Sequence, residues 1–492
     1  MAMFTRIKSR FYQDSLKLMR VSSEIKDLQG VRQAFAFMAT ENNKRSRIQE
    51  AMMGEDVRAA GADDLVLIVE CDDAAAGNAM LDEFEKRIAS TGAVGNSDGA
   101  EALPSTFEQG KAHVDANLAV ISVPGPYAAV QAMTALSHGM NVMLFSDNVS
   151  IEDEIMIKDF AAKQNLLVMG PDCGTAIIDG VPLCFANVVK KGSIGVVGAS
   201  GTGTQELTVL IDAAGCGITH AIGTGGRDLS EEVAGRTMFA ALKLLADDPA
   251  TEIIALVSKP PSPAVASRVL DAVKASGKPA VLAFLGADSK KAADNIYVAG
   301  TIEEAAAKAT ALCKETNPDN ATVIYERKAI DFALLDKLAP TQKAVKGLFT
   351  GGTLASEAKT VLGNVHADII DLGDDEYTRG ALHPMIDPSN RSSHIMDAFA
   401  DNTVAIVLCD VVLGYGSHDD PAGELAKDIA AARAKTNAYK IVIAAVVGTD
   451  SDPQAKLQQI KALKDAGVLV LPSNQYAAEA AAAYAKKIQG VQ

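Results

Sequence analysis

The stretch GVVGASGTGTQEL, residues 195–207, joins a run of apolar β-type residues to a loop of glycines and hydroxyl side chains that opens a helix. A mononucleotide-binding P-loop would end in Gly-Lys-Ser/Thr, but no lysine stands in this loop. The glycines also miss the G-x-G-x-x-G spacing of a dinucleotide-binding turn. Backbone N–H groups at a helix N-terminus beside hydroxyl donors still suit a phosphate or an oxyanion. We therefore expect an anion site made by Ser200, Gly201, Thr202, Gly203 and Thr204.

A second stretch, FTGGTLASEA at residues 349–358, repeats the pattern of strand, glycine-rich turn and amphipathic helix. In open α/β folds, ligands bind beyond the carboxyl ends of the strands, where a helix N-terminus offers unpaired N–H groups and the positive end of its dipole. Two such helix starts, in two domains, can face one anion. We expect Gly351, Gly352 and Thr353 to form the second half of the anion site.

Apolar runs alternate with helical runs through most of the chain, as in NLAVISV, NVMLFS, LLVMG, SIGVVGA, THAIGTG, EIIALVS and PAVLAFLG, and again in KGLFTGG, DIIDLG, AIVLCDVV, KIVIAAVV and VLVLPS. Continuous apolar strands separated by helices are typical of parallel sheets covered on both faces. Before them, FTRIKSRF, VRQAFAFMAT and DDLVLIVEC alternate with helices and fit a small ferredoxin-like domain. The predicted fold class is α/β, with parallel sheets and a small N-terminal α+β domain.

The 492 residues carry a formal net charge of -16 without a Lys/Arg-rich run, which disfavours nucleic acid and anionic membrane surfaces as partners. The N-terminal MAMFTRIKSRFYQDS lacks the apolar core of a signal peptide, and no long uncharged apolar run follows it. We expect a soluble cytoplasmic protein. The six cysteines have no C-x-x-C or His/Cys spacing, so we expect buried free thiols and no metal site.

Further glycine-rich turns follow other strands, at 170–175, 223–228, 371–375 and 413–416. A glycine after a strand most often makes only a tight turn, so each signal is weak by itself. Together these turns mark the carboxyl edges of the sheets. The candidates among them are Asp172, Cys173, Gly225 and Gly226.

The stretch HPMIDPSNR, residues 383–391, is the densest mixture of imidazole, carboxylate, amide and guanidinium in the chain. Arg391 can clamp a carboxylate or phosphate through two hydrogen bonds. The alternative is a proline-stiffened loop in which Asp387 and Asn390 only cap the next helix. His418 lies just past a strand end, where a role in the active site and a role in a capped loop are both open.

The order of these motifs resembles a known family. GPDCGT, GSIGVVGASGTGTQEL, IGTGGRDL and DDPATEIIALVSKPP look like the α subunit of succinyl-CoA synthetase, and GLFTGGTLASEA, DLGDDEYT and DNTVAIVLCDVVLGYG resemble the C-terminal domain of its β subunit. Both parts in one chain, with HPMIDPSNR between them, resemble the FdrA family. The residue pattern predicts the small α+β domain (1–92) and a mostly helical connector (313–344). The resemblance implies a Rossmann-like CoA-binding-type domain (110–191), a flavodoxin-like CoA-ligase domain (192–312) and a second flavodoxin-like domain (345–492).

In the synthetase, the two glycine-rich loops begin helices whose N-termini face each other across a phosphate, and three departures from it stand out here. The segment GADSKKAADNIYVAGTIEEAA lacks the histidine that the synthetase phosphorylates, so phosphohistidine chemistry is not expected. After EIIALVS, Lys259 stands where the synthetase has a glutamate. The positive charge of a lysine suits a bound anion better than the carboxylate of a glutamate does. The glycine-rich loop that grips CoA is missing, which leaves CoA as a possible but doubtful ligand, and the ATP-grasp half of the β subunit is absent.

The FdrA resemblance implies an oxamate carbamoyltransferase subunit of anaerobic allantoin (purine) degradation, which works with companion proteins. Oxalurate and phosphate would be exchanged for oxamate and carbamoyl phosphate. Lys259 and Arg391 would offset the phosphate charge, and His383 would move a proton. Two alternatives stay open: an acyl-CoA synthetase without the phosphohistidine, and a non-catalytic scaffold.

Overall fold

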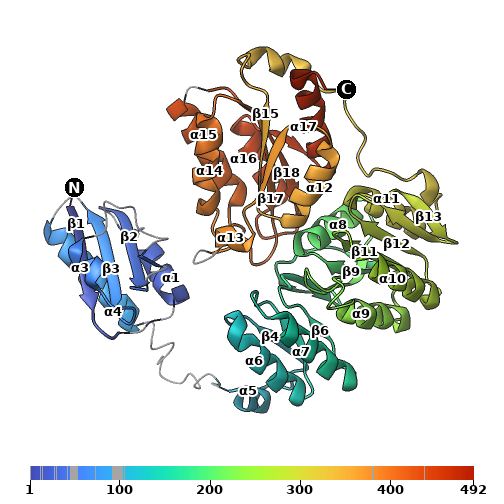
Figure 1. The fold of residues 1–492 in the computed structure, drawn as a ribbon, viewed down its shortest axis with the longest axis horizontal. Helices are drawn as coiled ribbons and strands as arrows, with labels where there is room; N and C mark the ends of the chain where they lie inside the picture. Colours follow the sequence, from blue (N-terminus) through green and yellow to red (C-terminus); the bar gives the residue numbers. More distant parts are fainter. Residues whose placement is uncertain are drawn as a thin grey trace. The chain divides into compact units, whose positions relative to one another are not determined.

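The computed structural model describes residues 2–11, 13, 15–26, 28, 30–40, 43–44, 54–71, 74–90, 104, 106–378, 382–436 and 438–491. The chain divides into two compact units, Met1–Gly110 and Lys111–Gln492 (Figure 1). The linker expected at 91–110 lies mostly outside the described residues. Within the described part, no helix combines the length and hydropathy that crossing a bilayer requires.

The first unit is the small α+β domain that the sequence predicts. Its sheet has the antiparallel order β1-β3-β2, which is the order of the first three strands of a ferredoxin-like fold. The central strand β3 is apolar on both faces, with Leu65 and Leu67 in one buried cluster and Val66 in another. The elements are β1 (Ala2–Lys8), α1 (Ser15–Lys26), β2 (Val31–Met38), α3 (Glu55–Ala59), β3 (Leu65–Cys71) and α4 (Ala74–Ser90).

The second unit starts with a short Rossmann-like sheet of parallel strands in the order β4-β5-β6. Helices α6 and α7 connect these strands and pack against each other. Ser150 caps α7 by accepting a hydrogen bond from the Asp153 N–H at 3.1 Å. The elements are α5 (Phe107–His113), β4 (Leu118–Ile121), α6 (Gly125–Ser137), β5 (Asn141–Leu144), α7 (Ile151–Lys163) and β6 (Val168–Met169).

Next comes an eight-stranded sheet whose parallel core has the order β10-β9-β11-β12-β14. Numbered along the chain, this is the 2-1-3-4-5 order of the flavodoxin-like fold. The hairpin β7–β8 pairs with β10 at one edge, and β13 pairs with β14 at the other. The elements are β7 (Thr175–Ile178), β8 (Val181–Cys184), β9 (Lys191–Ala199), α8 (Gly201–Ala213), β10 (Ile218–Gly223), α9 (Arg236–Asp247), β11 (Ile253–Ser258), α10 (Pro263–Ser276), β12 (Ala280–Phe284), β13 (Lys290–Ala293), β14 (Ile296–Ala299) and α11 (Ile302–Cys313).

The last sheet is fully parallel and repeats the flavodoxin-like order, as β16-β15-β17-β18-β19. In each of the two flavodoxin-like sheets, a helix starts after the first strand, beside the point where the strand order reverses. Ligands of open α/β folds bind at such points. The elements are β15 (Ala344–Phe349), α12 (Gly352–Leu362), β16 (Ala367–Asp371), α13 (Asp375–Thr378), α14 (Ser389–Ala400), β17 (Val404–Val412), α15 (Pro421–Thr436), β18 (Ile441–Val447), α16 (Lys456–Asp465), β19 (Leu469–Leu471) and α17 (Asn474–Gln489).

The α/β fold and every apolar run predicted to be a strand are confirmed. One prediction about the connector is wrong: within 314–343 the structure has only two short 3-10 helices, Pro318–Asn320 and Phe332–Lys337. The segment is held by long-range contacts instead of helical ones, because Arg327 pairs with both Glu303 and Glu479. The domain boundaries at 92, 110, 191, 312 and 344 stay predictions.

Candidate active site

The N-termini of α8 and α12 meet, although they belong to different sheets. Ser200, the N-cap of α8, accepts a hydrogen bond from the Gly203 N–H at 2.9 Å and donates its hydroxyl to Thr353 Oγ1 at 2.5 Å. Glycine is needed where the two turns touch, because a Cβ on Gly351 would lie only 2.6 Å from Thr202 Oγ1. The structure therefore brings together the two loops that the sequence predicts to share an anion.

Two helix N-termini that approach each other bring two partial positive charges together, each equivalent to about half an elementary charge. Their mutual repulsion is relieved when an anion binds between them, which makes this junction electrostatically suited to a phosphate. Not every hydroxyl of the first loop is available for that purpose. Thr204 is fully buried and donates its hydroxyl to the Ser200 carbonyl at 2.5 Å, so it stabilises its own helix turn.

The start of α12 is held in place by Asp410, a buried residue near the end of β17. Its carboxylate accepts the Thr350 N–H at 2.7 Å and the Gly351 N–H at 2.8 Å. Arg391 donates to the Asp410 carbonyl at 2.7 Å and lies 3.5 Å from one carboxylate oxygen. Burial raises the pKa of Asp410, while the Arg391 charge opposes that shift. Because Arg391 is only 2% exposed, its position fits a role in holding the loop better than the predicted open clamp.

Lys259 is an exposed residue directly after β11, and its charge acts on Asp371 at the end of β16. Burial raises the pKa of Asp371, and the Gly373 N–H together with Lys259 opposes that shift. Asp371 in turn lies against the start of α12, since a Cβ on Gly352 would be 2.2 Å from Asp371 Oδ2. Lys259 is thus an unburied cation near the second helix start.

His383 lies beside the same edge, close to Gly373 and with its ring centroid 5.8 Å from that of Phe185. Burial lowers the pKa of His383 to about 4, so the imidazole is neutral at physiological pH. The Met385 N–H points at Nδ1 at 3.2 Å, which places the ring proton on Nε2. His383 therefore offers a neutral N–H donor, and a weak base, in this position.

Comparisons with known proteins identify the domains and the family of the chain. A CoA-ligase family model matches residues 348–484, a CoA binding domain model matches 189–286, and a model described as "AllF, heavy metal-associated domain" matches 1–104. Protein YahF of Escherichia coli (strain K12) is 41% identical over 95% of this chain and 96% of its own length. The chain belongs to the YahF family. It has the FdrA-type fusion that the sequence predicts.

More distant relatives match only part of the chain. The α subunit of the ADP-forming succinate–CoA ligase of Aquifex aeolicus is 30% identical over 32% of this chain and 53% of its own length. The solved structure of a dinucleotide-forming acetyl-coenzyme A synthetase from Ca. Korarchaeum cryptofilum covers 76% of this chain at 15% identity, with a TM-score of 0.33, too low to add to the assignment. The family thus has a succinyl-CoA synthetase-like scaffold with CoA-binding-type and CoA-ligase domains.

The heavy metal-associated domain of this member lacks a pair of thiolate or imidazole ligands. Zinc sites in proteins are built mainly from such ligands. Residues 1–104 contain no histidine and a single cysteine, Cys71, which is 1% exposed within β3. Among the described residues, no cluster of three His, Cys, Asp or Glu side chains is placed to hold a metal.

The Rossmann-like sheet also fits the diphosphate of CoA poorly at its two helix starts. A Cβ on Gly125, the first residue of α6, would lie 2.2 Å from the Asn148 carbonyl oxygen, so backbone already fills that turn. Helix α7 carries the carboxylates of Glu152 and Asp153 in its first turn, and these repel phosphates.

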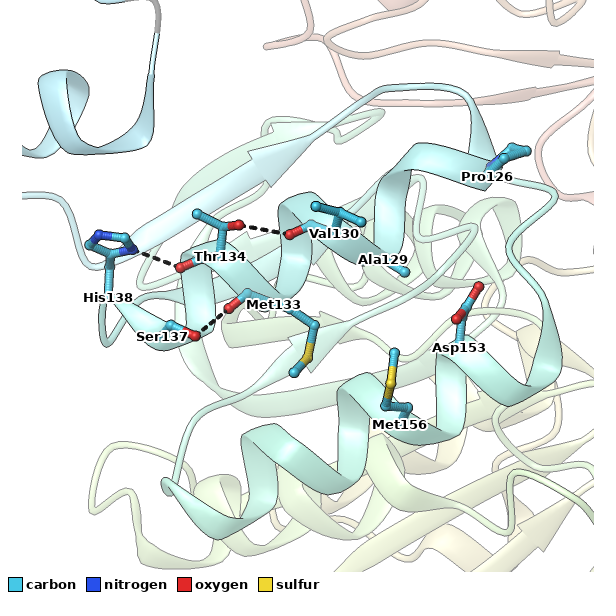
Figure 2. Close-up of a pocket in the computed structure, with 9 residues that line it drawn as sticks. All are labelled: Pro126, Ala129, Val130, Met133, Thr134, Ser137, His138, Asp153 and Met156. Carbon is cyan, nitrogen blue, oxygen red and sulfur yellow. Dashed lines mark hydrogen bonds between the residues drawn. The ribbon is translucent and has the colours of Figure 1, made fainter.

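A groove of about 510 Å3 lies between α6 and α7, outside the helix junction (Figure 2). Its hydroxyls are already used, because Thr134 and Ser137 donate to the Val130 and Met133 carbonyls of their own helix (Figure 2). The groove offers mainly apolar side chains such as Met156. It lacks the converging polar groups that a small anionic substrate needs.

The remaining predicted residues have local partners. Asp387 accepts the Ser389 N–H at 3.0 Å, and Asn390 donates to the Leu382 carbonyl at 2.5 Å, so Asn390 does not cap the next helix as the loop alternative has it. His418 Nδ1 accepts the Asp420 N–H at 3.1 Å.

The 170–175 and 223–228 turns lie against each other beside the start of α8. Gly225, at φ +84°, approaches the Pro171 carbonyl so closely that a Cβ would lie 2.2 Å from it, and Gly226 is exposed. Asp172 is exposed in the left-handed region at φ 54°. Burial raises the pKa of Cys173 to about 12, so its thiol is not a nucleophile at neutral pH.

Sequence reasoning missed a buried acidic group behind the two helix starts. Glu206 in α8 accepts the Asn474 backbone N–H at 3.0 Å, and Glu357 in α12 accepts the Asn474 side-chain amide at 2.7 Å. Glu357 also accepts the Ile302 N–H at 2.7 Å. The glutamates hold the starts of α17 and α11 against α8 and α12. The sequence offered one signal for this pair: Glu206 in TQEL (204–207) and Glu357 in SEA (356–358) stand at matching positions of the two helices.

Proposed function

We propose that this chain binds phosphate or an acyl phosphate between the N-termini of α8 and α12 and transfers the acyl group. The observation that carries the proposal is the contact of the two helix starts through Ser200 and Thr353 at 2.5 Å. Lys259 supplies a nearby cation. No histidine stands between β12 and α11, so the phosphate is not held covalently on an imidazole in that segment.

Within this proposal, a carbamoyl group is the acyl group that we favour. An oxygen of hydrogen phosphate attacks the carbamoyl carbon of oxalurate, and the C–N bond to the oxalyl part breaks. The leaving nitrogen takes the proton that the hydrogen phosphate gives up, which yields carbamoyl phosphate and oxamate. His383, neutral and protonated at Nε2, donates a hydrogen bond to the developing charge. Arg391 and Asp410 keep the α12 loop in place. Companion subunits supply whatever the chain itself lacks.

The second candidate is an acyl-CoA synthetase. The CoA binding domain and CoA-ligase matches, and the identity to succinate–CoA ligase, favour it. The crowded start of α6 and the acidic start of α7 count against CoA binding at the Rossmann-like sheet. The third candidate is a scaffold without a ligand. A chain with only that role would bind neither phosphate, carbamoyl phosphate nor CoA.

The test is ligand binding to the full chain, measured by thermal shift and calorimetry with phosphate, carbamoyl phosphate and CoA. The variant Ser200→Ala removes the N-cap and the bond to Thr353, and we expect at least tenfold weaker phosphate binding. Ser150→Ala is the matched control, because it removes an equivalent N-cap from α7 and costs a similar amount, about 1 kcal/mol of stability. If the chain binds CoA but neither phosphate nor carbamoyl phosphate, the synthetase is favoured. If it binds none of the three compounds, the scaffold role is favoured.

A further inference from the structure

Helix α6 has apolar side chains on its buried face and on its exposed face. Ala128, Ala132 and Leu136 are fully buried, whereas Tyr127 and Val130 are each 66% exposed. No Asp, Glu, Lys or Arg stands between residues 125 and 137, although charged residues make up 22% of the chain. A helix that is apolar all round is normally a buried helix. The exposed face of α6 therefore has the composition of a surface that another molecule covers.

The groove between α6 and α7 continues this exposed face. Met133 of α6 and Met156 of α7 enter the groove from its two walls, and Met156 is 46% exposed (Figure 2). Tyr and Met are enriched, and charged residues are depleted, at the cores of protein interfaces. We call Tyr127, Val130, Met133 and Met156 together the α6 surface. Its composition is that of an interface core, and methionine side chains can adapt their shape to a partner.

The two ends of the groove carry groups of opposite chemistry. Helices α6 and α7 run in the same direction, because both connect parallel strands of one sheet. Asp153 lies at the end where the two helices begin, and His138 lies at the end where α6 stops (Figure 2). Nδ1 of His138 donates to the Thr134 carbonyl at 2.8 Å, so the imidazolium form donates to a carboxylate from Nε2.

A second copy of the chain complements this arrangement of charges. A two-fold axis through the middle of the groove turns one copy end for end, so His138 of each copy faces Asp153 of the other. The α6 surfaces of the two copies then meet between these pairs. Such a contact uses the same residues on both copies and closes as a dimer. Because each chain has a formal net charge of -16, two copies approach most easily where α6 carries no charge.

We propose that the α6 surface is the interface of a two-fold symmetric dimer of this chain, with a His138–Asp153 pair at each end. The test is sedimentation velocity of the full chain over a range of concentrations, in which we expect the native chain to dimerise. Val130→Glu places an unpaired carboxylate in the contact on both copies and should weaken the dimer about a hundredfold.

Leu457→Glu is the matched control for Val130→Glu. Leu457 is 67% exposed on α16, outside the α6 surface, so its variant should dimerise as the native chain does. Equal dimerisation of Val130→Glu and the native chain would overturn the proposal. A native chain that stays monomeric at every concentration would also overturn it and would leave a different protein as the occupant of the groove.

A reversal of the two end groups tests the two-fold arrangement itself. His138→Glu sets two carboxylates against each other at both ends and should weaken the dimer about tenfold. Adding Asp153→Lys gives each end an opposite pair again and should restore the dimer. Restoration shows a direct contact between the two positions, since a fold defect at one helix is not repaired by a charge change at the other. A double variant that dimerises no better than His138→Glu would contradict the proposed axis.

Discussion

Ser200 and Thr353 lie 153 positions apart in the chain and share a hydrogen bond of 2.5 Å at the junction of two domains. Each residue belongs to a glycine-rich turn after the first strand of a flavodoxin-like sheet. The contact makes one anion-binding surface out of two helix starts that would each bind an anion weakly. Anything that separates the two turns should therefore weaken phosphate binding more than it weakens the fold.

Gly351→Ala tests this expectation directly. The new Cβ would lie 2.6–2.8 Å from the atoms of the Thr202 side chain, so the two turns must move apart. We expect at least tenfold weaker phosphate binding in calorimetry and a loss of about 1–3 kcal/mol in urea unfolding. Adding Thr202→Gly removes the Oγ1, Cβ and Cγ2 atoms that clash and should restore part of the stability. A Gly351→Ala chain with native phosphate affinity would contradict a shared site.

Arg391 and Asp410 should behave as a buried pair that positions the α12 loop. Arg391→Met removes the charge and leaves the Asp410 carboxylate buried without its partner, which typically costs about 3–5 kcal/mol. The double variant with Asp410→Asn should lose less than the sum of the two single losses, as measured by urea unfolding. Additive losses would mean that Arg391 acts on something other than Asp410, such as a bound anion.

The strands and the pairing of the two glycine-rich loops were predictable because both follow from local pattern. Apolar runs of strand length are visible in the sequence, and so is the repeated order of strand, turn and helix. The β7–β8 hairpin was missed although Asp179-Gly180 gives its signal, with both residues at positive φ, 49° and 79°. That is the backbone of a tight two-residue hairpin turn.

The role of Arg391 could not be predicted, since its partner lies on another element. A guanidinium in a polar loop suggests an open clamp, and only the fold reveals that it is buried against Asp410. The one available signal was the single acid inside the apolar strand VAIVLCDVV, because a buried carboxylate needs a partner. The connector was wrongly predicted as helical for a related reason, since Arg327 fixes it through contacts with Glu303 and Glu479.

The N-terminal domain should not bind zinc stoichiometrically. Cys71 is buried and no histidine precedes residue 113, so no pair of thiolate or imidazole ligands is available there. We expect metal analysis of the full chain, after exposure to Zn2+ and desalting, to find well below one equivalent. Cys71→Ser should not change the result. Stoichiometric metal that is lost in Cys71→Ser would contradict this prediction.

The buried glutamates behind the helix junction should make the protein less stable as the pH rises. Burial raises the pKa of Glu206 to about 8 and that of Glu357 to about 7, from an ordinary value of 4.5. Both carboxyls are protonated in both states below pH 4.5, so neither affects stability there. Between pH 4.5 and 8 the unfolded chain loses these protons before the folded chain does, and stability falls by up to about 1.4 kcal/mol per pH unit for each group.

Glu206→Gln is the variant that isolates this effect, because its amide oxygen can still accept the Asn474 N–H while the side chain cannot ionise. Urea unfolding at pH 5.5, 7 and 8.5 should show a flatter pH dependence for Glu206→Gln, with the variant gaining on the native chain as the pH rises. If Glu206→Gln unfolds with the native pH dependence, the carboxyl is already ionised at neutral pH, and the two helix starts carry a buried negative charge behind them. That charge would itself attract the positive ends of α8 and α12 and compete with the phosphate, so the same measurement decides how strongly the junction binds an anion.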